Sequence, residues 1–99
     1  MINLELHTSI VQKINNQHNV IENEVRQCFY NITNGFLIDD REDHRTDPPT
    51  LWFVAETDEG RLLKIICIHH KDRNQFILKS AYDANPATLA LYQKLTRVT

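Results

Sequence analysis

The chain of 99 residues has few of the residues from which several kinds of functional site are built. It contains two glycines and no glycine-rich phosphate-binding loop, which argues against nucleotide-driven chemistry of that type. Its two cysteines, Cys28 and Cys67, are too few for a disulfide framework, and no closely spaced cysteine pair is present. Both fall at apolar positions of the pattern, so we expect them to be structural.

Long apolar runs and a strong charge of one sign are absent as well. No stretch approaches the ~18 apolar residues of a membrane span, and the N-terminal MINLELHTS lacks the regions of a signal peptide, so we expect a cytoplasmic protein without a membrane partner. The length predicts a single domain over residues 1–99, and the hydrophobic fraction of 41% is typical of a globular protein. The net charge of −2 argues against a protein that coats nucleic acid with its whole surface.

The hydrophobic spacing predicts three helices. Apolar residues recur at helical intervals over residues 8–17 and 21–32. We expect His18-Asn19 to end the first of these helices, with His18 as a cap, and Asn34-Gly35 to end the second. In Asn85-Pro86 an N-cap residue precedes a proline, which predicts the start of a third helix.

Between the second and third helices the pattern becomes extended. Four apolar runs bounded by turn residues predict strands, namely GFLIDD, TLWFVAET, RLLKIICIHH and QFILKSAY. The expected order of elements is ααββββα. We therefore predict an α+β domain in which helices cover one face of a four-stranded antiparallel meander.

Side-chain alternation assigns the strand residues to two faces. A three-residue loop at 58–60 and an even loop at Asp72-Arg73 are the turn lengths that keep one face apolar. That face is expected to carry Leu51, Phe53, Ala55, Leu63, Ile65, Cys67, Phe76, Leu78 and Ser80. The opposite, open face is expected to carry Trp52, Val54, Glu56, Leu62, Lys64, Ile66, Ile68, His70, Ile77, Lys79 and Ala81. Lys64 and Lys79 would then be near neighbours.

Several short motifs resemble a known family. They are the stretch from Lys13 to Val20 with the glutamates behind it, the strand GRLLKIICIHH, and the segment FILKSAYDANPATLALY. These are similar to segments of BrnT-like toxins, and EDHRTDPPTLWFVAETDEGRLLKI resembles a block of uncharacterised small bacterial proteins related to that group. The resemblance covers most of the chain. It implies a RelE-like fold and a ribonuclease that cleaves messenger RNA without a cofactor and is silenced by a DNA-binding antitoxin.

Metal-free RNA cleavage requires a base for the 2′-hydroxyl proton, an acid for the leaving oxygen, and cations for the charged phosphorane. The expected open face offers Glu56 or His70 as base or acid. Lys64, Lys79 and Arg61 are expected to contact phosphate. A solvated cross-strand pair of lysine and glutamate is the structural alternative to this catalytic assignment.

Further RNA contacts are expected outside this group. Trp52 and Tyr82 offer rings on which bases can stack, and Lys13 is a cation on the first helix. The polar loop between the first two strands adds Arg41 and Arg45, which we expect to contact RNA or a partner. This loop lacks the ligand spacing of calcium and zinc sites, so we expect no metal there.

Two alternatives to a nuclease stay open. The same fold could be a non-catalytic module that docks a protein partner, or it could form a homodimer. Either would use the apolar residues Trp52, Val54, Ile66 and Ile68 of the open face. The net charge of −2 favours these alternatives over RNA binding.

Overall fold

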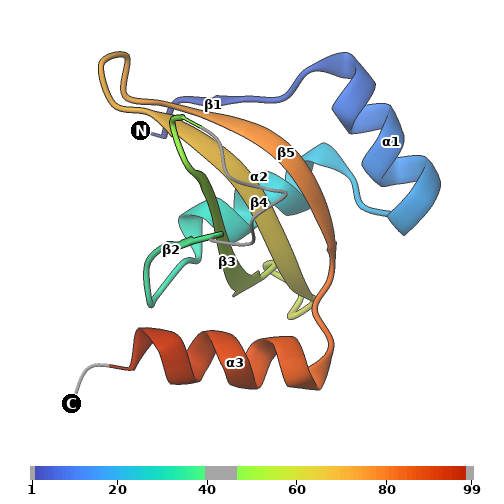
Figure 1. Cartoon of the computed structure of the whole chain (residues 1–99). Helices are drawn as coiled ribbons and strands as arrows, with labels where there is room; N and C mark the ends of the chain where they lie inside the picture. Colours follow the sequence, from blue (N-terminus) through green and yellow to red (C-terminus); the bar gives the residue numbers. More distant parts are fainter. Residues whose placement is uncertain (1, 40–46, 98–99) are drawn as a thin grey trace.

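The computed structural model describes residues 2–39 and 47–97 (Figure 1). The elements are β1 (Leu4–Glu5), α1 (Thr8–His18), α2 (Glu22–Tyr30), β2 (Leu37–Ile38), β3 (Thr50–Glu56), β4 (Leu62–His70), β5 (Gln75–Asp83) and α3 (Pro86–Thr96). The five strands form one sheet in the order β1-β5-β4-β3-β2. The protein is therefore an α+β fold with three helices. No helix within the described ranges is both long and apolar enough to cross a membrane.

The sheet contains one strand more than the expected order ααββββα. β2 to β5 are antiparallel neighbours, whereas β1 pairs in parallel with β5, where Leu4 lies opposite Phe76 and Glu5 opposite Ile77. The prediction of a four-stranded sheet is therefore wrong. A strand of two residues is too short to show an alternating pattern, so the sequence gives no periodic signal for it.

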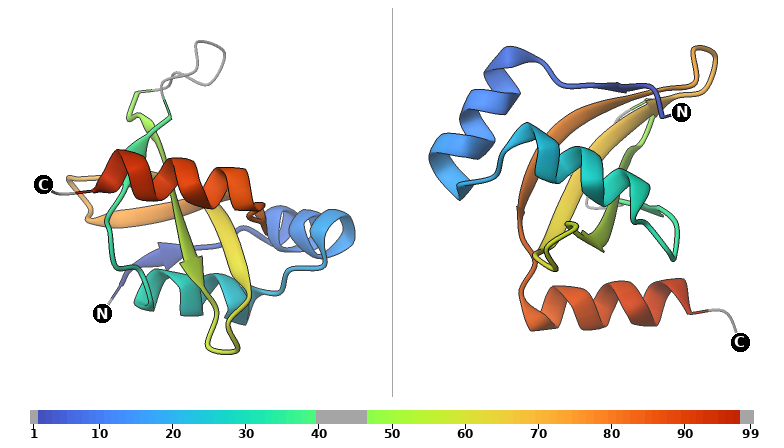
Figure 2. Two further views of the ribbon diagram at one scale, coloured as in Figure 1. Left: turned by 90° about the horizontal axis from the view of Figure 1, so that it is seen from below. Right: turned by 180° about the vertical axis from the view of Figure 1, so that it is seen from behind.

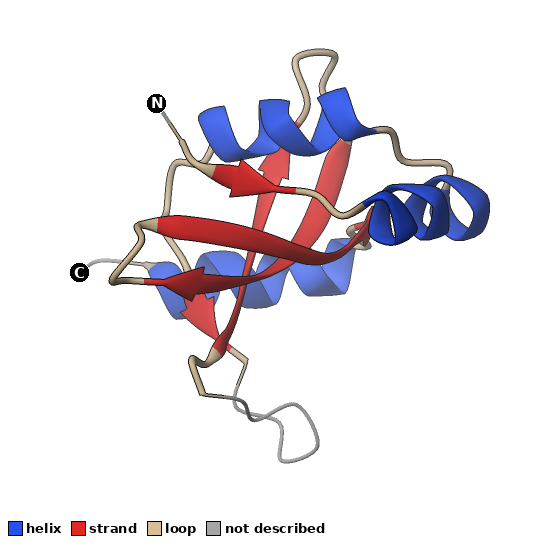
Figure 3. Ribbon diagram, turned by 90° about the horizontal axis from the view of Figure 1, so that it is seen from above, coloured by secondary structure: helices blue, strands red, loops and turns tan. Residues whose placement is uncertain are grey.

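Helices cover both faces of the sheet, so the prediction of helices on one face is also wrong. α2 packs on β3 and β4, and α1 packs beside β5 (Figure 2). α3 lies over β3 on the opposite face, and Figure 3 shows the sheet between α2 and α3. Trp52 and Val54, which were expected on an open face, are only 8% and 4% exposed because α3 covers them.

The core between α2 and the sheet is built around phenylalanines. Phe29 of α2 contacts Phe53 of β3 and Phe76 of β5, with ring centroids 5.0 Å and 5.5 Å apart. Phe36 stacks on Phe76 at 5.1 Å. Aromatic pairs at these distances contribute more than their buried area alone. This cluster fixes α2 across the face that the sequence predicted to be apolar.

Both cysteines belong to this core. Cys28 and Cys67 are free and fully buried, and the thiol of Cys28 donates to the carbonyl oxygen of Ala55 at 3.5 Å. Burial raises the pKa of both thiols to about 12. The prediction that they are structural is confirmed by their burial.

The first hairpin has the predicted three-residue loop. The backbone N–H of Thr57 donates to the oxygen of Arg61 at 2.8 Å, and Gly60 has a φ of +88°. A residue with a side chain would be strained at this φ, so glycine sets the loop length. Phe53 consequently lies opposite Ile65, on the predicted face.

The second hairpin departs from the prediction at a β-bulge. Ile66 of β4 lies opposite Ser80 and Cys67 lies opposite Leu78, so Lys79 of β5 is an extra residue without a partner in the register. Beyond the bulge the alternation of β5 is reversed. Ser80 lies opposite Ile66, and Ala81 is buried in the core, so the predicted faces of Ser80 and Ala81 are wrong. A single inserted residue leaves no mark in an otherwise regular apolar pattern.

Candidate functional site

The sheet face under α3 has a covered part on β3 and a more accessible part on β4 and β5. We call the half-exposed residues of the second part the open strip: Lys64, Ile66, Ile68, Ile77, Ser80 and Tyr82. Their register places Lys64 opposite Tyr82 and Ile66 opposite Ser80. The open strip therefore brings one cation and one phenol side by side among aliphatic residues.

Lys64 is held between aromatic rings. Its Nζ lies 4.6 Å from the ring centroid of Trp52 and 5.9 Å from that of Tyr82. An ammonium over a ring face is attracted by the ring quadrupole, typically by about 0.5–1 kcal/mol at exposed sites. The two predicted RNA contacts Trp52 and Tyr82 thus flank the predicted phosphate contact.

His18 joins this group from a distant part of the chain. It is the last residue of α1, and its ring centroid lies 5.4 Å from that of Tyr82 in an edge-on arrangement. Tyr82 is therefore in contact with an imidazole and close to an ammonium. The sequence predicted His18 only as a helix cap, because nothing in its pattern fixes where the end of α1 lies over the sheet.

Arg61 ties the end of α1 to the rest of the domain. Its Nη2 and Nη1 donate to the backbone oxygens of His18 and Asn19 at 3.1 Å and 2.8 Å. Nη1 also donates to the Glu24 carboxylate at 3.1 Å, and Nε donates to Asp83 at 2.8 Å. The second N–H of Nη2 donates to the other oxygen of Asp83 at 3.0 Å, so all five N–H donors of the guanidinium have acceptors within the protein. A phosphate that binds Arg61 would have to replace some of these acceptors. The structure therefore argues against the prediction that Arg61 contacts RNA.

The electrostatics of this junction follow from the same contacts. The hydrogen bonds from Arg61 hold the pKa of Asp83 below its ordinary value, and the charges of Arg61 and His18 lower it further. The hydrogen bond to Asp83 likewise raises the pKa of Arg61. The carboxylate of Asp83 is thus ionised near neutral pH and lies within electrostatic range of the His18 ring.

Glu56 and His70, the predicted acid and base, lie at opposite ends of the sheet. Glu56 is exposed and lies opposite Leu62, whereas His70 is the last residue of β4. The length of β4 separates them by about 26 Å at roughly 3.3 Å per residue. They cannot act on one phosphate, although each alone stays a prediction. His70 lines a separate hollow of about 520 Å³ with Ile38 and Leu51.

The other residues predicted to contact RNA differ in how accessible they are. Trp52 is covered by Tyr92, whose ring centroid lies 5.7 Å away, and by Lys64, so no base can stack on it. Lys79 in the bulge and Lys13 on α1 are exposed. The predicted contacts Arg41 and Arg45 lie outside the described residues.

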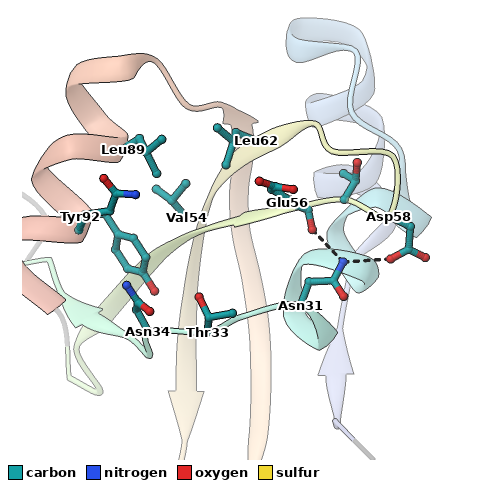
Figure 4. A pocket seen from close by; sticks show the side chains of 11 residues that line it. Asn31, Thr33, Asn34, Val54, Glu56, Asp58, Leu62, Leu89 and Tyr92 are labelled. Atoms are coloured by element: carbon teal, nitrogen blue, oxygen red, sulfur yellow. Dashed lines mark hydrogen bonds between the residues drawn. The ribbon is translucent and has the colours of Figure 1, made fainter. Parts of the chain in front are cut away.

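A cleft of about 640 Å³ lies on the same sheet face, between α3, the end of β3 and the loop after α2 (Figure 4). Its apolar lining comes from Val54, Leu62 and Leu89, and its carboxylates are Glu56 and Asp58. No lysine or arginine is among the described residues that line it. We call it the acidic cleft. Its charge makes it unsuited to phosphate.

Asn31 shapes one end of the acidic cleft. Its side-chain Nδ2 donates to the backbone oxygen of Glu56 and to Oδ1 of Asp58, each at 2.9 Å (Figure 4). α2 ends at Tyr30, before Asn31, and not at the predicted Asn34-Gly35. The amide of Asn31 is therefore free to link the helix end to the first hairpin.

An apolar groove of about 500 Å³ borders Lys64 on the other side, between β2 and α3. Ile38 of β2 is 62% exposed, and Leu91 and Leu95 of α3 are 48% and 54% exposed. These are among the large hydrophobic side chains most accessible to a partner. The groove thus offers an apolar surface directly beside the cation of the open strip.

The chain matches no known protein-family model, and no curated protein or solved structure is significantly similar to it. Among residues 2–39 and 47–97, no three His, Cys, Asp or Glu side chains are grouped to hold a metal ion. The contacts of Tyr82 with His18 and Lys64 make these three side chains the candidate site.

Proposed function

We propose that the protein is a ribonuclease of the toxin type, the toxin of a bacterial toxin–antitoxin pair that cleaves messenger RNA without a metal. The observation that carries this proposal is the pairing of Lys64 with Tyr82 on the open strip, with Nζ 5.9 Å from the ring centroid. Single-stranded RNA is bound by stacking of bases on aromatic rings and by cations at adjacent phosphates. The resemblance of several segments to BrnT-like toxins supports the same function.

The groups of the open strip suit the charge that develops during cleavage. The 2′-oxygen attacks phosphorus, the bond to the 5′-oxygen breaks, and negative charge accumulates on the phosphorane. Lys64 supplies a cation at a fixed position, and the exposed Lys79 supplies a second one from the bulge. Glu56 lies diagonal to Lys64 in the register, at about 7–8 Å by ordinary sheet geometry, and stays a candidate base.

Regulated expression in a bacterial host tests the proposal. Wild-type protein should arrest growth and leave cleaved messenger RNA, and the double variant Lys64→Ala, Lys79→Ala should do neither. Lys71→Ala, Lys94→Ala is the matched control, because both lysines are exposed and lie away from the open strip. Normal growth and intact messenger RNA with the wild type would reject the nuclease.

A non-catalytic binding module is the second candidate, and the exposure of Ile38, Leu91 and Leu95 along the apolar groove favours it. The cognate antitoxin is the partner that the toxin proposal requires, and a homodimer is the alternative. Of the four residues predicted to dock a partner, Trp52 and Val54 are largely buried by α3, although Trp52 still lines the groove, and Ile66 and Ile68 are half-exposed. The molar mass in solution from light scattering separates a single chain from a homodimer, with Leu95→Lys as the variant that should prevent association through the groove.

A further inference from the structure

We propose that His18 is the residue that takes the proton from the attacking 2′-hydroxyl of RNA on the open strip; this inference rests on the proposed ribonuclease function. His18 and Lys64 both lie against Tyr82. The ring centroid of His18 is 5.4 Å from that of Tyr82, and Nζ of Lys64 is 5.9 Å from it. A single nucleotide bound at the Tyr82 ring can therefore contact both the ammonium of Lys64 and the imidazole of His18. Imidazole is the side chain that most often transfers protons at neutral pH.

The backbone around His18 is fixed on both sides. Ile14, one helical turn earlier, and Val20, two residues later, are fully buried, and the N–H of Val20 donates to the oxygen of Ile14 at 3.2 Å. Asn19 adopts a left-handed conformation with a φ of 54°. Arg61 then binds the backbone oxygens of His18 and Asn19. A proton-transfer group gains from such a rigid support, because its distance from the reacting oxygen must hold within a fraction of an ångström.

Charged groups surround this position from several elements. Tyr82 of β5 contacts the imidazole edge-on, and Asp83 of β5 interacts with it electrostatically. Arg61 donates to the backbone oxygen of His18 and also to the carboxylate of Glu24 on α2. Asp83 is ionised and interacts electrostatically with His18. The carboxylate of Asp83 attracts the positive charge that the imidazole gains with a proton, although both of its oxygens accept hydrogen bonds from Arg61.

The proposed step balances without a metal or redox partner. The 2′-oxygen forms a bond to phosphorus while its proton passes to the neutral imidazole of His18. The bond from phosphorus to the 5′-oxygen then breaks, and the 5′-oxygen takes the electron pair and a proton from water. The products are a 2′,3′-cyclic phosphate and a 5′-hydroxyl, and the imidazolium returns its proton to the hydroxide that remains.

Cleavage of a labelled single-stranded RNA oligonucleotide by the purified protein tests the inference. His18→Gln should lower kcat about 100-fold or more, the range for loss of a general base, and should leave KM within about twofold. The pH profiles of kcat should also differ between the wild type and His18→Gln, because only the wild type has the proposed base at this position. His7→Gln is the matched control, because His7 is exposed and directly precedes α1.

The outcomes separate the two proposals. A wild type that cleaves RNA, together with a His18→Gln variant of equal kcat and equal pH profile, would overturn the role of His18 and leave the ribonuclease standing. A wild type that cleaves no RNA would reject both. His18→Asn provides a second, smaller substitution, so a His18→Gln protein that fails to fold, seen by its circular dichroism, is replaced by a variant subject to the same criteria.

Discussion

The acidic cleft and the open strip lie on one sheet face but differ in charge and chemistry. The acidic cleft contains the carboxylates of Glu56 and Asp58 and no lysine or arginine among its described lining. The open strip holds Lys64 beside Tyr82, with His18 in contact with the same ring. The carboxylates of the first region disfavour a phosphate, whereas the cation of the second region is the kind of group that the proposed RNA contact requires. A net charge of −2 disfavours RNA binding over the whole surface, but it leaves room for a local site around one cation.

α3 creates this difference by its position. Tyr92 is almost fully buried against Trp52, and its hydroxyl donates to the backbone oxygen of Gly35 at 2.6 Å. The helix therefore occupies the middle of the face and leaves a hollow on each side.

Removal of the anchor of α3 should have the largest effect. Tyr92→Ala loses a buried aromatic ring, so we expect the free energy of unfolding to fall by about 3–5 kcal/mol. Tyr92→Phe keeps the ring and loses the hydrogen bond, which should cost about 1 kcal/mol. Urea unfolding measures both values. Equal values for the two variants would show that the hydroxyl, and not the ring, holds α3.

Loss of the Arg61 junction should come next. Arg61→Ala removes hydrogen bonds to two carboxylates and to the end of α1, so we expect destabilisation by about 2 kcal/mol. Arg73→Ala in the exposed turn is the control and should change stability by less than about 0.5 kcal/mol. A variant of Arg61 as stable as this control would mean that water replaces the junction without cost.

The sequence correctly predicted those parts of the fold that local interactions determine. Gly60 permits the left-handed turn that sets the register of the first hairpin. Asn85 caps α3 as predicted, since its side chain accepts from the N–H of Thr88 at 2.7 Å. Features that depend on tertiary packing were missed. The apolar stripe of α3 shows that the helix packs on something, but not on which face of the sheet.

The candidate site could be predicted only in part, because it too depends on tertiary packing. Alternation along strands places Lys64 and Tyr82 on faces, but the bulge at Lys79 shifts the register between them and leaves no trace in the sequence. The contact of His18 with Tyr82 joins residues 64 positions apart and depends on how α1 packs. No local pattern encodes such a contact.

Removal of one charge from the open strip and one from the acidic cleft should affect the affinity for RNA differently. Lys64→Gln should weaken binding of a single-stranded RNA about fivefold, or roughly 1 kcal/mol, and reduce the salt dependence by about one phosphate contact. Glu56→Gln in the acidic cleft should leave the affinity unchanged or raise it. Fluorescence anisotropy at several salt concentrations measures both. Equal losses for the two variants would mean that RNA crosses both regions.

The smallest effect should be the contribution of Asp83, which follows Tyr82 of the open strip, to the pH dependence of stability. Arg61 lowers the pKa of Asp83 in the folded protein, so folding favours the ionised carboxylate. The resulting stabilisation is fully present above the ordinary aspartate pKa of about 3.9 and is lost as the pH falls through the lower folded value. The urea midpoint of the wild type should therefore fall more steeply below about pH 4 than that of Asp83→Asn. Because the side chain of Asp83 is largely exposed, solvent screens the interaction and the difference should be small. Parallel curves for the two proteins would show that Arg61 stabilises the end of α1 through Glu24 and the backbone oxygens of His18 and Asn19, and not through Asp83.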